Sequence, residues 1–243
     1  TMKKNLLLLP FLLLSFFGFT QDVKEIDSTA VFLLDKMGDV IGDLESVSFE
    51  ANNSADELDA NKNIIKHYSA SVLSFSGSNK LRIRTEGTKG KKGMFYDGSH
   101  LSYYNFDENN YITLEAPEST LEMIDKMHLD YNFNFPAADF FYPSFTDDML
   151  EQFSTIKYLG SEFINGEECH RIMATNDEIN VQLWLSNGTY LLPKRFVIIY
   201  KNKSNLQYES TFSNWIINPN IPNSTFDFLP PPHAKLISIL KKS

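Results

Sequence analysis

Apolar and polar residues alternate along most of this chain, between about Val47 and Phe228. Successive side chains of a β-strand point to opposite faces of a sheet, so such alternation is typical of strands with one buried and one solvated face. It is clearest where Leu81 and Ile83 alternate with arginines. Dipeptides that favour tight hairpins interrupt the alternation at Asp97-Gly98, Asn165-Gly166 and Asn187-Gly188. The sequence therefore predicts a mainly antiparallel sheet.

A few segments have helical spacing instead. Asp27 is a suitable N-cap for an amphipathic helix that ends at about Gly42. A second helix is predicted over residues 119–129, and one or two helical turns over residues 147–153. With so few helices beside many strands, the predicted fold class is α+β, mainly β.

Three boundaries within the strand region follow from local composition. Val47–Ala51 is predicted to be a short strand, and the polar stretch over residues 52–63 is predicted to be a loop. Residues 226–228 are expected to form the last strand, ahead of three consecutive prolines. We find no internal repeat or linker, so a single domain is the expected organisation.

The first twenty residues have the order of a secretory signal. Two lysines precede an apolar stretch over residues 6–19, which ends in small residues where a signal peptidase cleaves. A membrane span needs ~20 residues, so a membrane anchor is the less favoured alternative. We expect residues 1–20 to be a signal peptide cleaved before Gln21, leaving a soluble periplasmic domain over residues 21–243.

Charge and cysteine content narrow the possible partners. The formal net charge of −9 disfavours nucleic acids and anionic membranes as main partners, because both are negatively charged. Cys169 is the only cysteine, so no intramolecular disulfide can form. An exported protein without disulfides depends on its buried core for stability.

No group of residues forms a convincing catalytic or metal site. Cys169 and His170 are neighbours on a predicted strand, so their side chains point to opposite faces and cannot act as nucleophile and base. Asp125 and His128 can share a helix face, but no third ligand has suitable spacing for zinc. We therefore predict no catalysis, no cofactor and no metal.

Two segments are open to more than one interpretation. The basic stretch Gly87–Gly93 lacks the ending of a phosphate-binding loop, so it is predicted to be a hairpin tip that contacts an anionic head group or a partner. The aromatic stretch Tyr131–Phe145 is either part of the core or a lid over an apolar cavity.

Short motifs follow one another in a particular order along the chain. They are Phe95-Tyr96-Asp97-Gly98, Ala116-Pro117, Pro136-Ala137-Ala138-Asp139, Tyr158-Leu159-Gly160, Asn165-Gly166, Cys169-His170, Gln182-Leu183-Trp184-Leu185, Leu192-Pro193-Lys194-Arg195, Phe212-Ser213-Asn214-Trp215, Phe226-Asp227-Phe228 and Pro231-Pro232. This ordered series resembles a bacterial family of predicted periplasmic proteins of unknown function, with one departure at His233, where a small residue is expected. That family is in turn similar to the lipoprotein-carrier superfamily of LolA, LppX and RseB types.

The resemblance implies a strongly curved half-barrel of antiparallel strands with helices over its concave face, in a single LolA-like domain. It also implies a space that receives acyl chains or lipoprotein lipids, with no catalytic residues. We therefore expect a lipid, acyl-chain or lipoprotein carrier. The alternative is an RseB-like sensor of the cell envelope, which would bind a protein partner through edge strands or the tip at Lys89–Lys92.

Alternation selects the residues expected to line the apolar space. The sheet and the aromatic lid contribute the following candidates: Leu73, Phe75, Leu81, Ile83, Tyr103, Leu183, Leu185, Phe196, Ile198, Phe140, Phe141 and Phe145.

Overall fold

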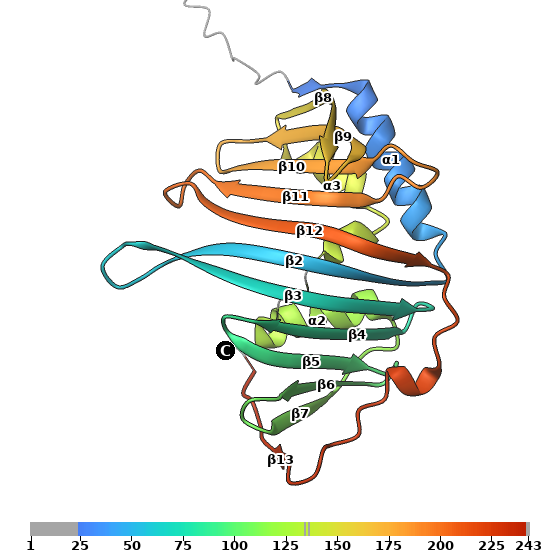
Figure 1. Ribbon diagram of the computed structural model, residues 1–243, viewed down its shortest axis with the longest axis vertical. Helices are drawn as coiled ribbons and strands as arrows, with labels where there is room; N and C mark the ends of the chain where they lie inside the picture. The colour runs from blue at the N-terminus through green and yellow to red at the C-terminus, as the bar shows by residue number, and fades with distance from the viewer. Residues whose placement is uncertain (1–23, 134, 136, 242–243) are drawn as a thin grey trace, which may run out of the picture.

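One large, unclosed sheet forms most of the molecule (Figure 1). A computed structural model describes residues 24–133, 135 and 137–241, so the predicted signal peptide lies outside the described residues. The sheet has 13 strands in the order β1-β8-β9-β10-β11-β12-β2-β3-β4-β5-β6-β7-β13. All neighbours are antiparallel except the short outermost pairs β1–β8 and β13–β7, which are parallel. The predicted α+β, mainly β, half-barrel class is confirmed.

The strands are longer in the centre of the sheet than at its edges (Figure 1). Their bounds are β1 Glu25–Ile26, β2 Ser46–Leu58, β3 Ile64–Ser76, β4 Lys80–Gly87, β5 Gly90–Tyr96, β6 His100–Asn105, β7 Asn110–Glu115, β8 Thr155–Ile164, β9 Glu167–Thr175, β10 Ile179–Ser186, β11 Pro193–Tyr200, β12 Leu206–Ile217 and β13 Lys235–Leu236.

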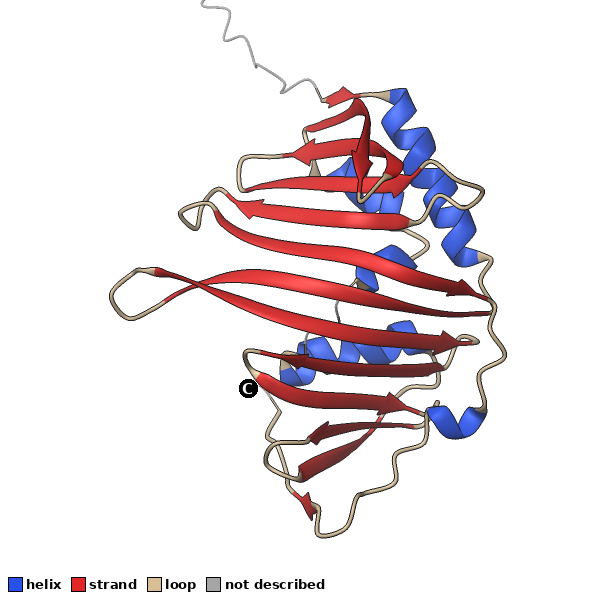
Figure 2. Cartoon of the chain, in the orientation of Figure 1, coloured by secondary structure: helices blue, strands red, loops and turns tan. Residues whose placement is uncertain are grey.

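Helices lie behind the strands in the view of Figure 2, while the N-terminal helix runs past one end of the strands. In α1, the Asp27 carboxylate caps the helix by accepting a hydrogen bond from the Thr29 backbone N–H at 2.7 Å, as the sequence predicts. The helical elements are α1 Ser28–Gly42, α2 Thr120–Tyr131, the 3₁₀ helix η1 Ala138–Phe141, α3 Phe145–Gln152 and the 3₁₀ helix η2 Asn223–Thr225. The three predicted helices are therefore present, each within a few residues of its expected bounds.

The core lies between the sheet and these helices. Directly paired residues of antiparallel strands share a face, so the register carries the buried side from strand to strand. Phe49 pairs with Leu73 and Leu73 with Ile83, and all three are at most 3% exposed. They belong to the same buried cluster as Leu34 and Met37 of α1. The helix-bearing face is thus the buried face of the sheet.

Tight turns connect most of the strands, as the dipeptides predict. Asn165 and Gly166 both have positive φ, at 52° and 84°, which is the backbone of a two-residue hairpin turn. Gly98 has φ of 99° between β5 and β6. The β10–β11 hairpin differs, because its connection over residues 187–192 is longer than a tight turn.

Two strand predictions are wrong. The polar stretch after Ala51 continues β2 as far as Leu58, because its backbone pairs with both β12 and β3. Its Asn53 is buried and accepts hydrogen bonds from the Ser210 and Tyr208 hydroxyls at 2.7 and 3.1 Å. Residues 226–228 are not a strand; Phe226 is fully buried and ends η2. In both places tertiary contacts override local propensity.

The β2–β3 hairpin lies in the middle of the strand order and projects beyond the ends of the neighbouring strands (Figure 2). Pairing with β12 ends at Ala55, and pairing of β3 with β4 ends at Ser69. Residues 56–68, called the hairpin arm here, therefore extend past both neighbouring strands.

Candidate functional site

A pocket of about 680 Å³ lies on the helix-bearing face of the sheet. Its floor comes from β10 and β11, and its walls come from α2, η1, α3 and the segment between α2 and η1. The described residues that line it are Ile124, Asp125, His128, Leu129, Phe133, Phe135, Ala138, Asp139, Tyr142, Phe145, Asp148, Met149, Gln152, Phe153, Ile179, Val181, Phe196 and Ile198.

Strand register places the floor near the same ends of the strands from which the hairpin arm projects. Val181 pairs with Ile198, Ile198 with Tyr208, and Tyr208 with Ala55 at the base of the arm. The floor side chains are apolar because they continue the inward-facing alternation of their strands. Pocket and arm therefore lie toward the same ends of the strands.

Aromatic stacking anchors the segment that covers the sheet here. The Phe141 ring stacks on Phe75 and Phe49, with centroid separations of 4.4 and 6.3 Å. The adjacent Phe140 ring makes edge contacts with Phe196 and Phe212, at 5.4 and 5.7 Å. Such pairs stabilise a structure beyond their buried area. The aromatic segment therefore contributes side chains both to the buried core and to the wall of the pocket.

Carboxylates surround the open side of the pocket. Asp125 accepts a hydrogen bond from the Tyr142 hydroxyl at 2.6 Å, which ties α2 to the end of η1. Asp148 accepts one from the Ser144 hydroxyl at 2.8 Å. No hydrogen bond from a described side chain reaches the Asp139 carboxylate. The three aspartates are exposed, whereas lining residues such as Phe145 and Val181 are buried. The pocket therefore has an apolar interior and an acidic rim.

The environment of Asp139 disfavours its negative charge. Although the residue is open to the pocket, protein surrounds it on other sides, and this desolvation raises the pKa of its carboxyl group. A hydrogen bond from the Asp139 backbone N–H and the neighbouring His128 partly lower the pKa, while the nearby Asp148 carboxylate raises it further. Burial and the hydrogen bond to Asp125 likewise raise the pKa of the Tyr142 hydroxyl, so this group stays a donor at neutral pH.

The structure brings only part of the predicted site together. Phe145, Phe196 and Ile198 line the pocket. Tyr103 lies outside it, packed on Phe133 at 5.6 Å between ring centroids. Phe75 and Phe141 stack on each other. The remaining candidates lie in the buried core at 3% exposure or less: Leu73, Leu81, Ile83, Leu183, Leu185 and Phe140. A direct role in ligand binding stays a prediction for all twelve.

Sequence reasoning missed most of the pocket. Ile179 and Val181 continue the alternation of Leu183 and Leu185 and could have been found from it. The three-residue spacing of Asp125 and His128 correctly predicts a shared helix face, and both residues line the pocket. Nothing in the local sequence indicates which end of the sheet these helices cover.

The other candidate groups have structural roles. Cys169 is fully buried beside Trp184 and Val197 in a small separate cluster. His170 instead lies against the Tyr158 hydroxyl, with 3.0 Å between Nδ1 and Oη. The cysteine and histidine thus have different surroundings, as expected for opposite faces of a strand.

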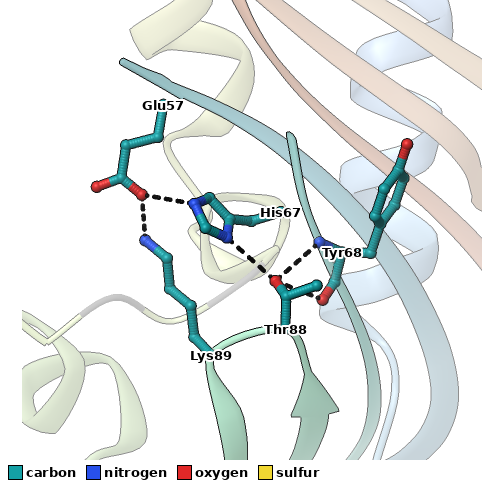
Figure 3. A network of polar contacts seen from close by, with 5 residues as sticks. All are labelled: Glu57, His67, Tyr68, Thr88 and Lys89. Carbon is teal, nitrogen blue, oxygen red and sulfur yellow. Dashed lines mark hydrogen bonds and ion pairs between the residues drawn. The ribbon is translucent and has the colours of Figure 1, made fainter. Parts of the chain in front are cut away.

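The basic stretch forms the β4–β5 hairpin, whose tip contacts the hairpin arm (Figure 3). Lys89 at this tip forms an ion pair with Glu57 of the arm. His67 is 3.1 Å from both the Glu57 carboxylate and the Thr88 hydroxyl. Lys89 is therefore engaged by the protein's own carboxylate, and the two hairpins support each other.

A comparison with protein families decides which family this chain belongs to. A family model described as "Predicted periplasmic protein (DUF2092)" matches residues 30–240. The chain belongs to the DUF2092 family. The expected family of predicted periplasmic proteins is thereby confirmed, whereas no curated protein matches the chain. No helix in the described part of this DUF2092 chain has the length and apolar character needed to cross a bilayer.

Solved structures similar to this DUF2092 chain share little sequence with it. An uncharacterized conserved protein from Thermus thermophilus is 9% identical, with a TM-score of 0.48, over 86% of this chain and 98% of its own. The lipoprotein LppX from Mycobacterium tuberculosis is 13% identical, with a TM-score of 0.48, over 81% and 98%. A LolA superfamily protein from Nitrosomonas europaea is 12% identical, with a TM-score of 0.39, over 82% and 97%.

Proposed function

We propose that this chain binds a lipid or acyl chain in the periplasm and holds it without transforming it. The observation that carries the proposal is the apolar pocket of about 680 Å³ between the sheet and the helices. Pockets for small molecules commonly measure about 300–1,000 Å³ and are lined mainly by apolar side chains with a few polar groups. This pocket fits both criteria.

The lining favours binding over chemistry. Its apolar part offers aliphatic and aromatic surface, and burying an alkyl chain contributes ~0.8 kcal/mol per methylene. The described lining residues include no serine, threonine, cysteine or lysine; the groups among them that could act as nucleophiles are three aspartates, His128 and Tyr142. His128 shares a short contact with the Phe133 carbonyl oxygen, at 3.1 Å from its Nδ1. These features support a carrier or binding protein.

The proposed location follows from the family and the N-terminal sequence. The family is described as periplasmic, and residues 1–20 have the order of an export signal. We propose that this segment directs export and that residues 21–243 form the mature, single-domain protein.

Native mass spectrometry with solvent extraction tests the proposal directly. The mature protein would be purified from a bacterial periplasm under conditions that retain bound lipid. We expect a bound species of discrete lipid mass, which the extract then identifies by class. A ligand-free mass, together with no uptake of an uncharged alkyl probe, would refute lipid binding.

A second function, binding of an envelope protein, is favoured by the hairpin arm. Leu58, Ile64, Ile65 and Tyr68 of the arm are 40–57% exposed, although they are large and apolar. Exposed apolar patches on projecting elements are typical of interaction sites. Crosslinking from position 64 in the periplasm tests this function, since a partner predicts one discrete adduct that a Tyr68→Lys substitution in the arm abolishes.

A further inference from the structure

We propose that the pocket selects alkyl chains with a cationic ammonium end over chains with an anionic end. This inference rests on the proposed lipid-binding function and specifies the ligand class of the same site. It depends on three observations: the signs of the charges around the pocket, the hydrogen-bonding capacity of those groups, and their position relative to the apolar interior.

The charged side chains that line the pocket are all acids, apart from one histidine. Asp125, Asp139 and Asp148 come from three different helical elements, α2, η1 and α3. No lysine or arginine is present among the described lining residues. Lys126 of α2 donates to the Glu115 backbone carbonyl at 3.4 Å and does not line the pocket. Because no compensating Lys or Arg is found among the rim residues that the structure describes, an anionic ligand end would meet like charges.

The carboxylates also have free capacity to accept hydrogen bonds. An ionised carboxylate has about four acceptor sites. Asp125 and Asp148 each accept one hydrogen bond from a neighbouring hydroxyl group. Asp139 receives none from a described side chain, while desolvation makes its isolated charge unfavourable. An ammonium group supplies N–H donors and positive charge, and charge-assisted hydrogen bonds of this kind are roughly twice as strong as neutral ones.

The distribution of polar and apolar residues fits an amphiphile. The three aspartates and His128 are exposed, which places them at the solvent side of the site. Lining residues from the same elements, such as Met149 and Phe153, are buried. An alkyl chain can therefore occupy the interior while its charged end stays at the rim. The apolar pocket provides binding, and the rim discriminates between charged ends.

The test compares three ligands with the same twelve-carbon chain: dodecylamine, 1-dodecanol and laurate. Each displaces an uncharged fluorescent probe from the mature protein at neutral pH and low salt, below the micellar concentration. We expect dodecylamine to bind most tightly and laurate most weakly, with at least about a tenfold difference in Kd between them. We expect Asp139→Asn to reduce this ratio several-fold and Asp139→Glu to retain it.

Asp147→Asn is the matched control. Asp147 lies on α3 next to Asp148, is exposed and does not line the pocket, so the substitution removes the same charge from outside the site. It should leave the ratio unchanged, with thermal unfolding used to verify that each variant folds. Equal affinities for the three ligands, or tighter binding of laurate, would overturn the selectivity while leaving lipid binding intact. No displacement by any ligand would overturn both.

Discussion

Tryptophan substitutions at two isoleucines distinguish the pocket from the core. Ile83 and Ile198 both face the helices and were predicted to line the same apolar space. Ile83 is 3% exposed within the core, whereas Ile198 is half-buried and borders the pocket. An indole at position 83 has no space to enter, while one at position 198 can extend into a volume of about 680 Å³. The two variants should therefore fail in different ways.

The expected magnitudes follow from packing. Overpacking a core costs about 1–3 kcal/mol, and a domain of this size loses about 2–4 °C in Tm per kcal/mol. Ile83→Trp should therefore lower the Tm by about 2–12 °C. Ile198→Trp should change the Tm little but exclude two or three ligand methylenes from contact. At ~0.8 kcal/mol each, this weakens alkyl-chain binding by about 10- to 50-fold.

The assay combines thermal unfolding with displacement of an uncharged alkyl probe on the same protein samples. Ile83→Trp should retain near-normal affinity in the fraction that stays folded. The reasoning is refuted if Ile83→Trp leaves the Tm unchanged and blocks binding while Ile198→Trp binds normally. That result would move the ligand site to the β3–β5 region of the sheet.

Three further outcomes are expected. Tyr142→Phe removes the hydrogen bond to Asp125 that joins two walls of the pocket, so stopped-flow displacement should show faster ligand dissociation. The Lys66 ammonium lies 2.7 Å from the Asp56 carboxylate and lowers its pKa below the usual 3.8. The ion pair therefore stabilises the fold above that pH, and this contribution is lost as the pH falls through the lower folded-state pKa. Urea titrations at several pH values should therefore show that the Lys66→Met variant loses less stability on acidification than the unsubstituted protein does. Burial raises the pKa of the Cys169 thiol, so a thiol reagent should modify it only after unfolding.

Much of the fold was predictable because local signals and tertiary structure agree. The alternation of Leu81 and Ile83 with arginines correctly identifies the buried side of β4. The Asn165-Gly166 pair adopts the two positive φ values that such a dipeptide favours. Asp27 caps α1 as expected, since a short side chain at this position satisfies a free N–H group.

The prediction failed where distant contacts decide the structure. Asn53 lies in a segment whose composition favours a loop, but Ser210 and Tyr208, more than 150 positions away, donate hydrogen bonds to it. The polar side chain is then satisfied within the sheet, and the segment stays extended. Phe226 is of a residue type that favours strands, but it occupies a buried position at the end of η2.

The sequence predicts which face of the sheet carries the site, but not where on that face the site lies. Alternation indicates which side chains of a strand point inward, and Leu183 and Ile198 do so as predicted. It does not indicate which inward-facing residues the helices cover. That depends on how Phe140 and Phe141 anchor η1 against the sheet, and this packing joins segments far apart in the sequence.

The pocket is open at its rim, where the three aspartates are exposed, so water or a ligand fills its volume of about 680 Å³. Water finds hydrogen-bond partners at the aspartates of the rim but none on side chains such as Val181 and Phe145. Under the proposed function, an alkyl chain would occupy the interior, and water or a polar head group would occupy the rim.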